Sequence, residues 1–150
     1  GTVTDGPLTP FSLAGWETPL ECSSANTTMT LHGWASVTEN LTIDLGNTVT
    51  PRFLIGSESV IISDRRSTGQ AVVEATTLAT MNWFERAEDR TRGALSLIHG
   101  TDAGNIVETA APAVVVGKIH QGQTAGILND SMPLSLCPVT GRDELTITVR

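Results

Sequence analysis

The sequence predicts a mainly β protein, an antiparallel β-sandwich or barrel with one flanking α-helix at about residues 77–90. Three observations lead to this fold class. Apolar and polar residues alternate with a period of two in several short segments, as they do in half-buried strands. The 150 residues include 14 glycines and 7 prolines, so the chain turns often. One segment breaks the alternation and repeats its apolar residues at helical spacing.

Residues 1–26 are expected to form an irregular arm or long loop that precedes a β domain at residues 27–150. They contain three prolines and a polar cluster at residues 23–28, which favour a loop over a strand. Two interpretations remain open. The segment is either a frayed terminus or an arm that packs on a neighbouring subunit, with Phe11 and Trp16 among its apolar anchors.

The first half of the β domain contains five expected strands, some alternating and some short and apolar. They lie at residues 28–32, 41–45, 53–55, 60–62 and 71–73. Ser67–Gly69 lies between the last two and predicts a hairpin turn. The consecutive apolar residues of these two runs indicate strands that are covered on both faces.

The helix is expected between these strands and the next group. Leu78, Met81, Phe84 and Ala87 recur at three-residue steps, so they share one helix face. Thr76 or Thr77 can cap the start of this helix. Gly93 stands where a glycine stop is expected.

The alternating pattern then resumes. Strands are expected at residues 95–98, 106–110, 113–119 and 134–137, with Pro112 separating the middle two and a polar loop at residues 121–126. The most regular alternation in the chain is Glu144–Arg150, which can bury Leu145, Ile147 and Val149 on one face.

Charge and composition narrow the function classes. The formal net charge is −7, and residues 1–50 carry acidic residues but no Lys or Arg. Without a basic stripe the chain is a poor candidate for tight nucleic-acid binding, because few phosphate counterions would be released. No apolar run reaches the roughly 18 residues of a membrane span.

The residues that could carry catalysis lack the spacing that catalysis requires. His32, His99 and His120 have no metal-ligand spacing to one another or to a cysteine. Cys22 and Cys137 are interpreted as two thiols rather than a disulfide, and a cysteine nucleophile would need one of them to meet a histidine in space. We therefore expect no enzymatic activity, no cofactor and no metal.

Several side chains are candidates for subunit contacts. Asp64, Arg65 and Arg66 form either an ordinary charged turn or a polar contact to a neighbouring subunit, since Arg is enriched at interfaces. Trp34 and Trp83 are either core residues or interface anchors. Arg86 belongs to a helical charge network that is either solvated or part of an interface.

Four stretches carry a resemblance to a known family. They are the strand pair that ends in Asp64–Arg65 within residues 53–66, the strand and helix at 74–92, the Gly104–Asn105–Ile106 segment that leads to Pro112, and the closing strand at 138–147. Their order resembles that of the major tail tube proteins of long-tailed bacteriophages, over roughly residues 36–150. Because such proteins often carry more β structure before this region, the chain is also compatible with being the C-terminal part of a longer subunit.

The resemblance implies a structural virion protein of the phage tail that assembles in the host cytoplasm. Proteins of this family, like the similar type VI secretion tube proteins, form six-membered rings that stack into a hollow tube. The tube encloses the tape-measure protein and conducts DNA without sequence-specific binding. Tail terminator and baseplate proteins would be further partners, and no membrane is involved.

The leading alternative belongs to a different class, a monomeric β-sandwich module that binds or adheres to a surface glycan. The low aromatic content, 4% of residues, counts against it. A cysteine hydrolase is the weakest of the three functional hypotheses, after the tail tube protein and the glycan-binding module. Self-assembly is favoured on physical grounds, because a closed ring pairs the strand edges that would otherwise be exposed.

Overall fold

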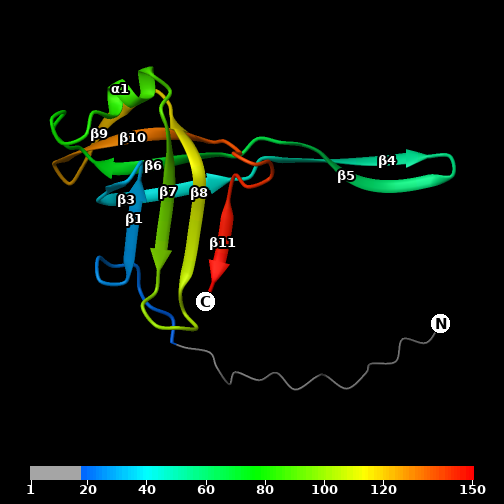
Figure 1. Cartoon of the computed structure of the whole chain (residues 1–150), viewed down its shortest axis with the longest axis horizontal. Coiled ribbons are helices and arrows are strands. Elements are labelled where there is room, and N and C mark those ends of the chain that lie inside the picture. Colours follow the sequence, from blue (N-terminus) through cyan, green and yellow to red (C-terminus); the bar gives the residue numbers. More distant parts are fainter. Residues whose placement is uncertain (1–17) are drawn as a thin grey trace.

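The computed structural model describes residues 18–150 and is mainly β, with antiparallel strands and one short helix, which confirms the predicted fold class (Figure 1). The elements in chain order are β1 (Thr27–Leu31), β2 (Trp34–Ala35), β3 (Thr38–Asp44), β4 (Asn47–Leu54), β5 (Ser57–Arg65), β6 (Thr68–Glu74), α1 (Trp83–Glu88), β7 (Arg92–His99), β8 (Val107–Val116), β9 (His120–Thr124), β10 (Ile127–Leu136) and β11 (Thr146–Val149). Residues 18–26, before β1, form neither helix nor strand.

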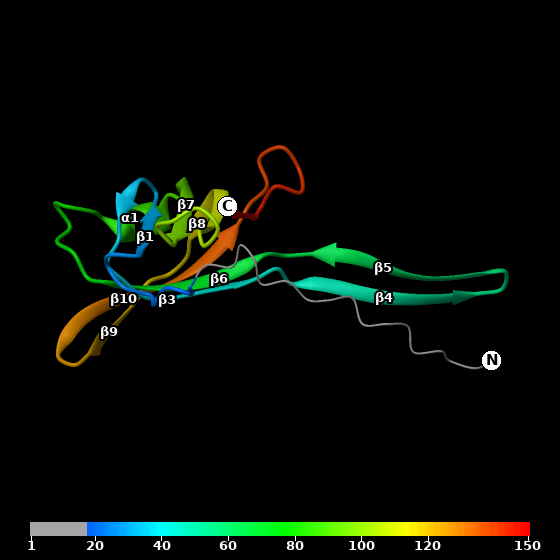
Figure 2. The same cartoon turned by 90° about the horizontal axis from the view of Figure 1, so that it is seen from below.

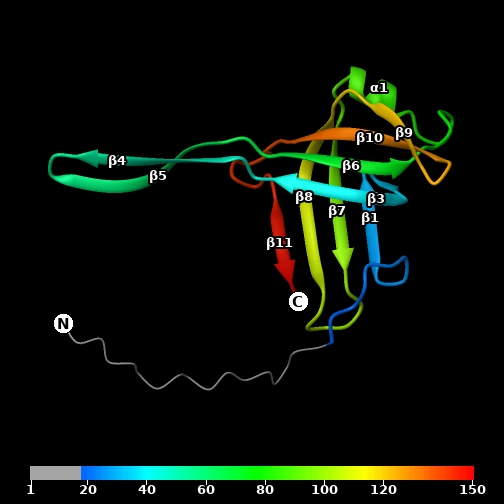
Figure 3. The same ribbon diagram turned by 180° about the vertical axis from the view of Figure 1, so that it is seen from behind.

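Nine strands form one sheet that folds into two crossing layers. The order is β2-β1-β7-β8-β10-β6-β3, with β11 added on β8 and β9 on β10. Strand β8 divides between two partners, because residues 107–110 pair with β11 and residues 114–116 pair with β10. The strands β1, β7, β8 and β11 form the first layer and run crosswise to β3, β6 and β10, which form the second layer, as Figures 1 and 3 show. Figure 2 shows the second layer lying along one side of the first.

The core lies where the two layers face each other. Its largest fully buried side chains are Leu31, Val73, Trp83, Leu95, Val114, Val116, Met132 and Leu134. In β10, Met132, Leu134 and Leu136 alternate with more exposed residues, as expected for a strand with one buried face. Truncating one such side chain to alanine typically costs about 2–5 kcal/mol of stability.

Helix α1 exists as predicted but is shorter than residues 77–90. The Thr77 carbonyl oxygen accepts hydrogen bonds from the backbone N–H groups of Thr80 and Met81, which makes a separate turn before the helix. Asn82 then caps α1, because its side chain accepts from the Glu85 N–H at 3.2 Å. Arg90, with φ 52°, ends it in place of Gly93, and the Thr91 N–H donates to the Arg86 carbonyl oxygen.

The hairpin turn predicted at Ser67–Gly69 is wrong. Strand β5 does not pair with β6; β4 pairs with β5, and β3 pairs with β6. Residues 67–69 lie where one long two-stranded ribbon enters the sheet. Burial of Val60–Ile62 on both faces is wrong too, since Val60 is 68% and Ile62 64% exposed, because these residues lie beyond the second layer.

Two other loops expected from the sequence are strands. Pro112 does not separate two strands but lies within β8, where the β7–β8 register shifts between Gly93 and Leu95. A bulge there tolerates a residue without an N–H. The polar loop expected at residues 121–126 is mostly β9, joined to β10 by a turn in which Ala125 and Gly126 both have positive φ.

The C-terminal strand forms as expected but does not bury the face predicted for it. Leu145 is partly buried against the core, whereas Ile147 is 62% and Val149 70% exposed. Strand β11 lies at a free edge of the sheet that residues 18–150 form (Figure 1). These residues leave the apolar face of β11 uncovered.

Candidate assembly interface

Strands β4 and β5 project from the body as a long two-stranded arm (Figures 1 and 2). The arm continues β3 and β6, so a single antiparallel ribbon runs from the sheet to the arm tip. The turn at the tip is Ile55–Gly56, and Gly56 has φ 86°, which a glycine adopts without strain. A two-stranded hairpin is at best marginally stable alone in water, so a partner that covers the arm would stabilise it.

The register of the arm gives it one apolar face. Residues directly opposite each other in an antiparallel pair share a face. The pairs Val49 with Ile62, Pro51 with Val60 and Phe53 with Glu58 lie on one side. We call Val49, Pro51, Phe53, Val60 and Ile62 the apolar arm face.

The apolar arm face is open to solvent throughout. Val49, Phe53, Val60 and Ile62 are each between 58% and 74% exposed. The opposite face is more polar and carries Arg52 opposite Ser59. The apolar arm face has one charge at its margin, Glu58, which lies opposite Phe53. An exposed apolar surface with a polar margin is typical of a protein–protein contact.

The predicted contact residues Asp64, Arg65 and Arg66 lie at the base of the arm. The guanidinium of Arg65 forms an ion pair with the Glu144 carboxylate, so it contacts its own chain. The Arg66 N–H donates to the Gly46 carbonyl oxygen at 3.3 Å, which closes the ribbon at this point. The side chains of Asp64 and Arg66 belong to exposed residues.

The other predicted contact residues gather at the opposite side of the fold. Trp83 is 1% exposed and belongs to the core of the subunit, the first of its two interpretations. Trp34 is half-buried and packs edge-to-face on Trp83, with ring centroids 5.8 Å apart. Arg86 lies close by, with Nη1 3.2 Å from His32 Nδ1.

His32 connects the helix to the sheet. Its Nε2 lies 2.9 Å from the Val114 carbonyl oxygen and donates to it, while Nδ1 accepts from Arg86. Burial lowers the pKa of His32 below its ordinary value of 6.5; the Val114 carbonyl opposes this shift, and the Arg86 charge adds to it. The imidazole is therefore neutral at pH 7, with its proton on Nε2.

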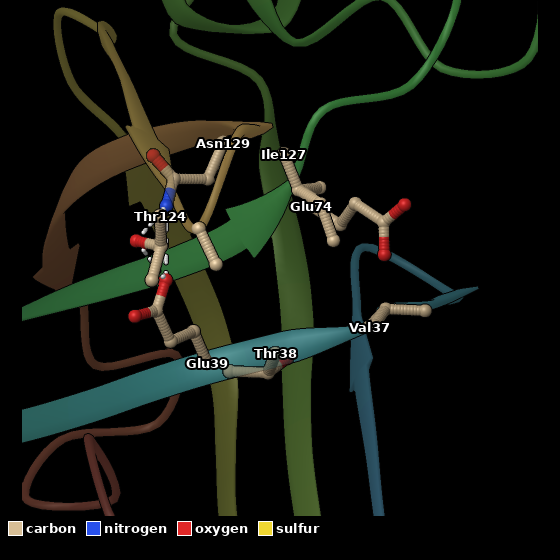
Figure 4. Close-up of a pocket in the computed structure, with 8 residues that line it drawn as sticks. Val37, Thr38, Glu39, Glu74, Thr124, Ile127 and Asn129 are labelled. Carbon is tan, nitrogen blue, oxygen red and sulfur yellow. Dashed lines mark hydrogen bonds between the residues drawn. The ribbon is translucent and has the colours of Figure 1, made fainter.

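A pocket of about 280 Å³ lies at the end of the ribbon opposite the arm (Figure 4). Its lining includes Val37, Glu39, Glu74, Thr124, Ile127 and Asn129. The Glu39 carboxylate accepts from Thr124 Oγ1 at 3.0 Å and from Asn129 Nδ2 at 2.9 Å. Val37 and Ile127 are 63% and 56% exposed, so the pocket combines apolar walls with two carboxylates.

A third uncovered apolar surface lies on β8 and β11. Val107 pairs with Val149 directly across the ladder, and Ile147 shares the face of Val149. Strand β11 also leaves one edge of its backbone unpaired among the described strands. Free edges of this kind favour pairing with another chain.

Among residues 18–150, the cysteine and histidine side chains show no catalytic arrangement. Cys22 and Cys137 are free thiols. Cys22 Sγ does lie 3.9 Å from His99 Nδ1, but that nitrogen is 2.8 Å from Thr27 Oγ1, and Cys22 is exposed. Residues 18–150 contain no cluster of three or more His, Cys, Asp or Glu side chains that could hold a metal ion.

No helix within residues 18–150 combines the length and apolar character needed to cross a membrane. Phe11 and Trp16, the anchors expected in the N-terminal arm, lie outside the described residues.

Neither the projecting arm nor the pocket was predicted from the sequence. The runs around Phe53 and Val60 were expected to be strands, but nothing in their composition shows that they leave the sheet. One local signal for a hairpin was present in the sequence, because Ile55–Gly56 lies between the apolar runs that contain Phe53 and Val60. The pocket is formed by residues from three separate segments, so no local pattern could reveal it.

Comparison with known proteins leaves the chain without a family match. No family model matches the sequence, and no curated protein matches it. Among solved structures, the fold is similar to the anti-feeding prophage cap, the cap that terminates its tube, with a TM-score of 0.62 and 10% identity over 89% of this chain and 95% of that one. It is also similar to a chain of the virion of a native gene transfer agent particle, with a TM-score of 0.54 and 10% identity over 86% of this chain and 100% of that one. At this level of identity the likeness establishes the fold.

Proposed function

We propose that this chain is a structural, non-enzymatic component of a phage-like tail that assembles with copies of itself. The observation that carries the proposal is the projecting arm, whose apolar face is not covered by any of residues 18–150 of the same subunit. Both similar folds come from phage-like particles, one a tube-terminating cap and the other part of a virion. A protein that leaves this much apolar surface on a thin ribbon gains stability when another chain covers it.

In its finer form, the proposal is that six copies form a ring and that rings stack into a tail tube. The arm and the free edge of β11 would supply contacts between copies, because both leave surface unpaired. A net charge of −7 would repel phosphates, so DNA could pass through a lumen without sticking. The tape-measure protein would occupy the same lumen, and tail terminator and baseplate proteins would contact the tube ends.

A second candidate is a tube-terminating cap. The observation that favours it is the likeness to the anti-feeding prophage cap, which has a higher TM-score than the gene transfer agent chain. A cap of this kind would form a ring that seals the end of a tube without stacking further. The two candidates therefore differ in whether rings repeat along an axis.

Electron microscopy of the purified full chain tests both candidates. Stacked rings or tubes are expected for a tube protein, and single rings for a cap. A chain that stays monomeric at high concentration contradicts self-assembly and favours the glycan-binding module.

A matched pair of arm variants tests the observation behind the proposal. Val60→Asp places a charge on the apolar arm face, whereas Ile61→Asp places one on the opposite face of the same strand, away from the tip. Both residues are exposed, so both variants are expected to keep the circular dichroism spectrum of the parent. Val60→Asp is expected to abolish assemblies, and Ile61→Asp to retain them. Equal assembly of the two variants would show that the apolar arm face is not an interface.

A further inference from the structure

The structure points to a receptor for the arm: we propose that the arm tip of one copy, residues 52–57, occupies the pocket between β3, β6 and the β9–β10 turn of a second copy. This inference rests on the proposed self-assembly and names the surface that the arm meets. No comparison and no sequence pattern assigns a role to this pocket.

The placement of tip and pocket on one ribbon is the first argument. Strands β3 and β6 carry the arm at one end, where Asp44 and Thr68 pair. At the other end, β3 supplies Glu39 and β6 supplies Glu74 to the pocket, and Val37 directly precedes β3. Figure 1 shows the arm tip and the β9–β10 turn at opposite extremes of the molecule.

This placement allows a head-to-tail contact. A tip in the pocket of the next copy leaves that copy's own tip free to enter a third pocket. A contact of this kind repeats in one direction, and it closes into a ring or continues as a filament according to the rotation between copies. A two-fold pair in which two copies exchange tips would use the same surfaces, so the head-to-tail arrangement follows from the proposed ring and not from the placement alone.

The apolar chemistry of the two surfaces matches. The tip presents Leu54, which is 54% exposed, and the fully exposed Ile55. The pocket presents Val37 and Ile127, both more than half exposed. At about 280 Å³ the pocket is just below the roughly 300–1,000 Å³ of pockets that hold drug-sized ligands, which suits one or two side chains.

The charges match as well. Arg52 is the one basic residue in residues 47–64, and it shares a face with Leu54. Glu58, the acidic residue that follows the tip, lies on the other face, opposite Phe53. A tip that inserts Leu54 therefore brings Arg52, and not Glu58, toward Glu39 and Glu74 of the pocket.

The pocket is already formed in the single subunit. Asn129 is 9% exposed and donates its amide to both Glu39 and Thr124, at 2.9 Å each. These bonds hold the Glu39 carboxylate toward the β9–β10 turn, while the Glu74 carboxylate points away from that network (Figure 4). Glu74 is thus the carboxylate that is available to a cation from another chain.

Disulfide capture between two distinguishable copies tests the docking. In a background with Cys22→Ser and Cys137→Ser, one copy carries Ile55→Cys and a copy of different tagged length carries Val37→Cys. Mild oxidation of the mixture is expected to give a heterodimer at roughly tenfold the yield of a control, since a disulfide needs close approach of the two Cβ atoms. The control pairs Ile55→Cys with Leu78→Cys, because Leu78 is 62% and Val37 63% exposed.

A charge exchange provides the second readout. Arg52→Glu is expected to lower assembly at least about tenfold, as expected when like charges meet at an interface. Glu74→Arg in the same chain is expected to restore assembly. Glu88→Arg, at an exposed residue of α1, is expected not to restore it.

The outcomes separate the docking from the function on which it rests. Rings or tubes in electron microscopy with no excess of the Ile55–Val37 heterodimer would overturn the docking alone. Monomers under all conditions would overturn the proposed self-assembly and the docking together. Rescue by Glu88→Arg as good as rescue by Glu74→Arg would also overturn the docking, because net charge would then explain the effect.

Discussion

Arg65, at the end of β5, forms an ion pair with Glu144, a residue 79 positions later in the chain. The pair connects the base of the arm to the segment that leads into β11. Both side chains are partly shielded, with 32% and 14% of their surfaces exposed. The ion pair therefore links two surfaces that we assign to assembly, the arm and the edge strand β11.

Removing this ion pair should weaken the base of the arm. Arg65→Met is expected to lower the free energy of unfolding by about 0.5–1 kcal/mol, near the upper end for a partly exposed pair. Urea unfolding at low and high salt measures the effect, which should shrink with added salt. Arg150→Met serves as control, because the Arg150–Glu108 pair is more exposed and should cost less. An equal loss for both variants would contradict a special role for Arg65.

The two tryptophans should be energetically coupled. Trp83→Ala is expected to cost about 3–5 kcal/mol because it opens a cavity in the core. Trp34→Ala should cost less, since Trp34 keeps part of its surface in solvent. A double-mutant cycle by chemical denaturation should give a coupling energy of about 0.5–1.5 kcal/mol for the edge-to-face pair. Strict additivity would show that the contact contributes nothing beyond burial.

Gly46, where β3 passes into the arm, should tolerate no side chain. It has φ 58°, and an added Cβ would lie 2.2 Å from the Arg66 carbonyl oxygen. Gly46→Ala is expected to destabilise by more than the roughly 1–2 kcal/mol of a left-handed alanine. Gly56→Ala isolates the backbone cost, because Gly56 also has positive φ but open space around it. Thermal unfolding of both variants gives the comparison, and equal losses would contradict the steric argument.

His32 should make stability fall with acid. Because its pKa in the folded chain lies below the unfolded value of 6.5, the unfolded state binds the proton more readily. The free energy of unfolding should therefore decrease as pH falls below about 6.5, until the folded form also protonates. His32→Asn, which suits the positive φ of 52°, should flatten the pH dependence in this window. His120→Asn, at an exposed position, is the matched control, and an equal flattening there would contradict the assignment.

The period-two pattern predicted the strands because it reports local geometry. Strands were predicted at residues 28–32 and 95–98, and residues 28–31 and 95–98 lie in β1 and β7. The same pattern does not state which partner covers an apolar face. Ile147 and Val149 alternate as regularly as Met29 and Leu31, yet the former are exposed and the latter are buried.

The candidate interface was less predictable because it depends on contacts between distant segments. Arg65 was singled out as a contact residue, but its partner Glu144 lies in another part of the chain. Phe53 and Ile62 were expected to lie in strands, and only the strand pairing shows that they project from the body. The pocket brings Glu39 and Asn129 together from 90 positions apart, which no sequence window can contain.

The continuity of β3 with β4 and of β5 with β6 has a mechanical consequence. A pull on the tip would run along these strands and across the hydrogen bonds that join β3 to β6 and β6 to β10. Many bonds would then share the load, whereas a pull at a right angle would open them one after another. A particle joined in this way would resist stretching along the ribbon better than prying across it.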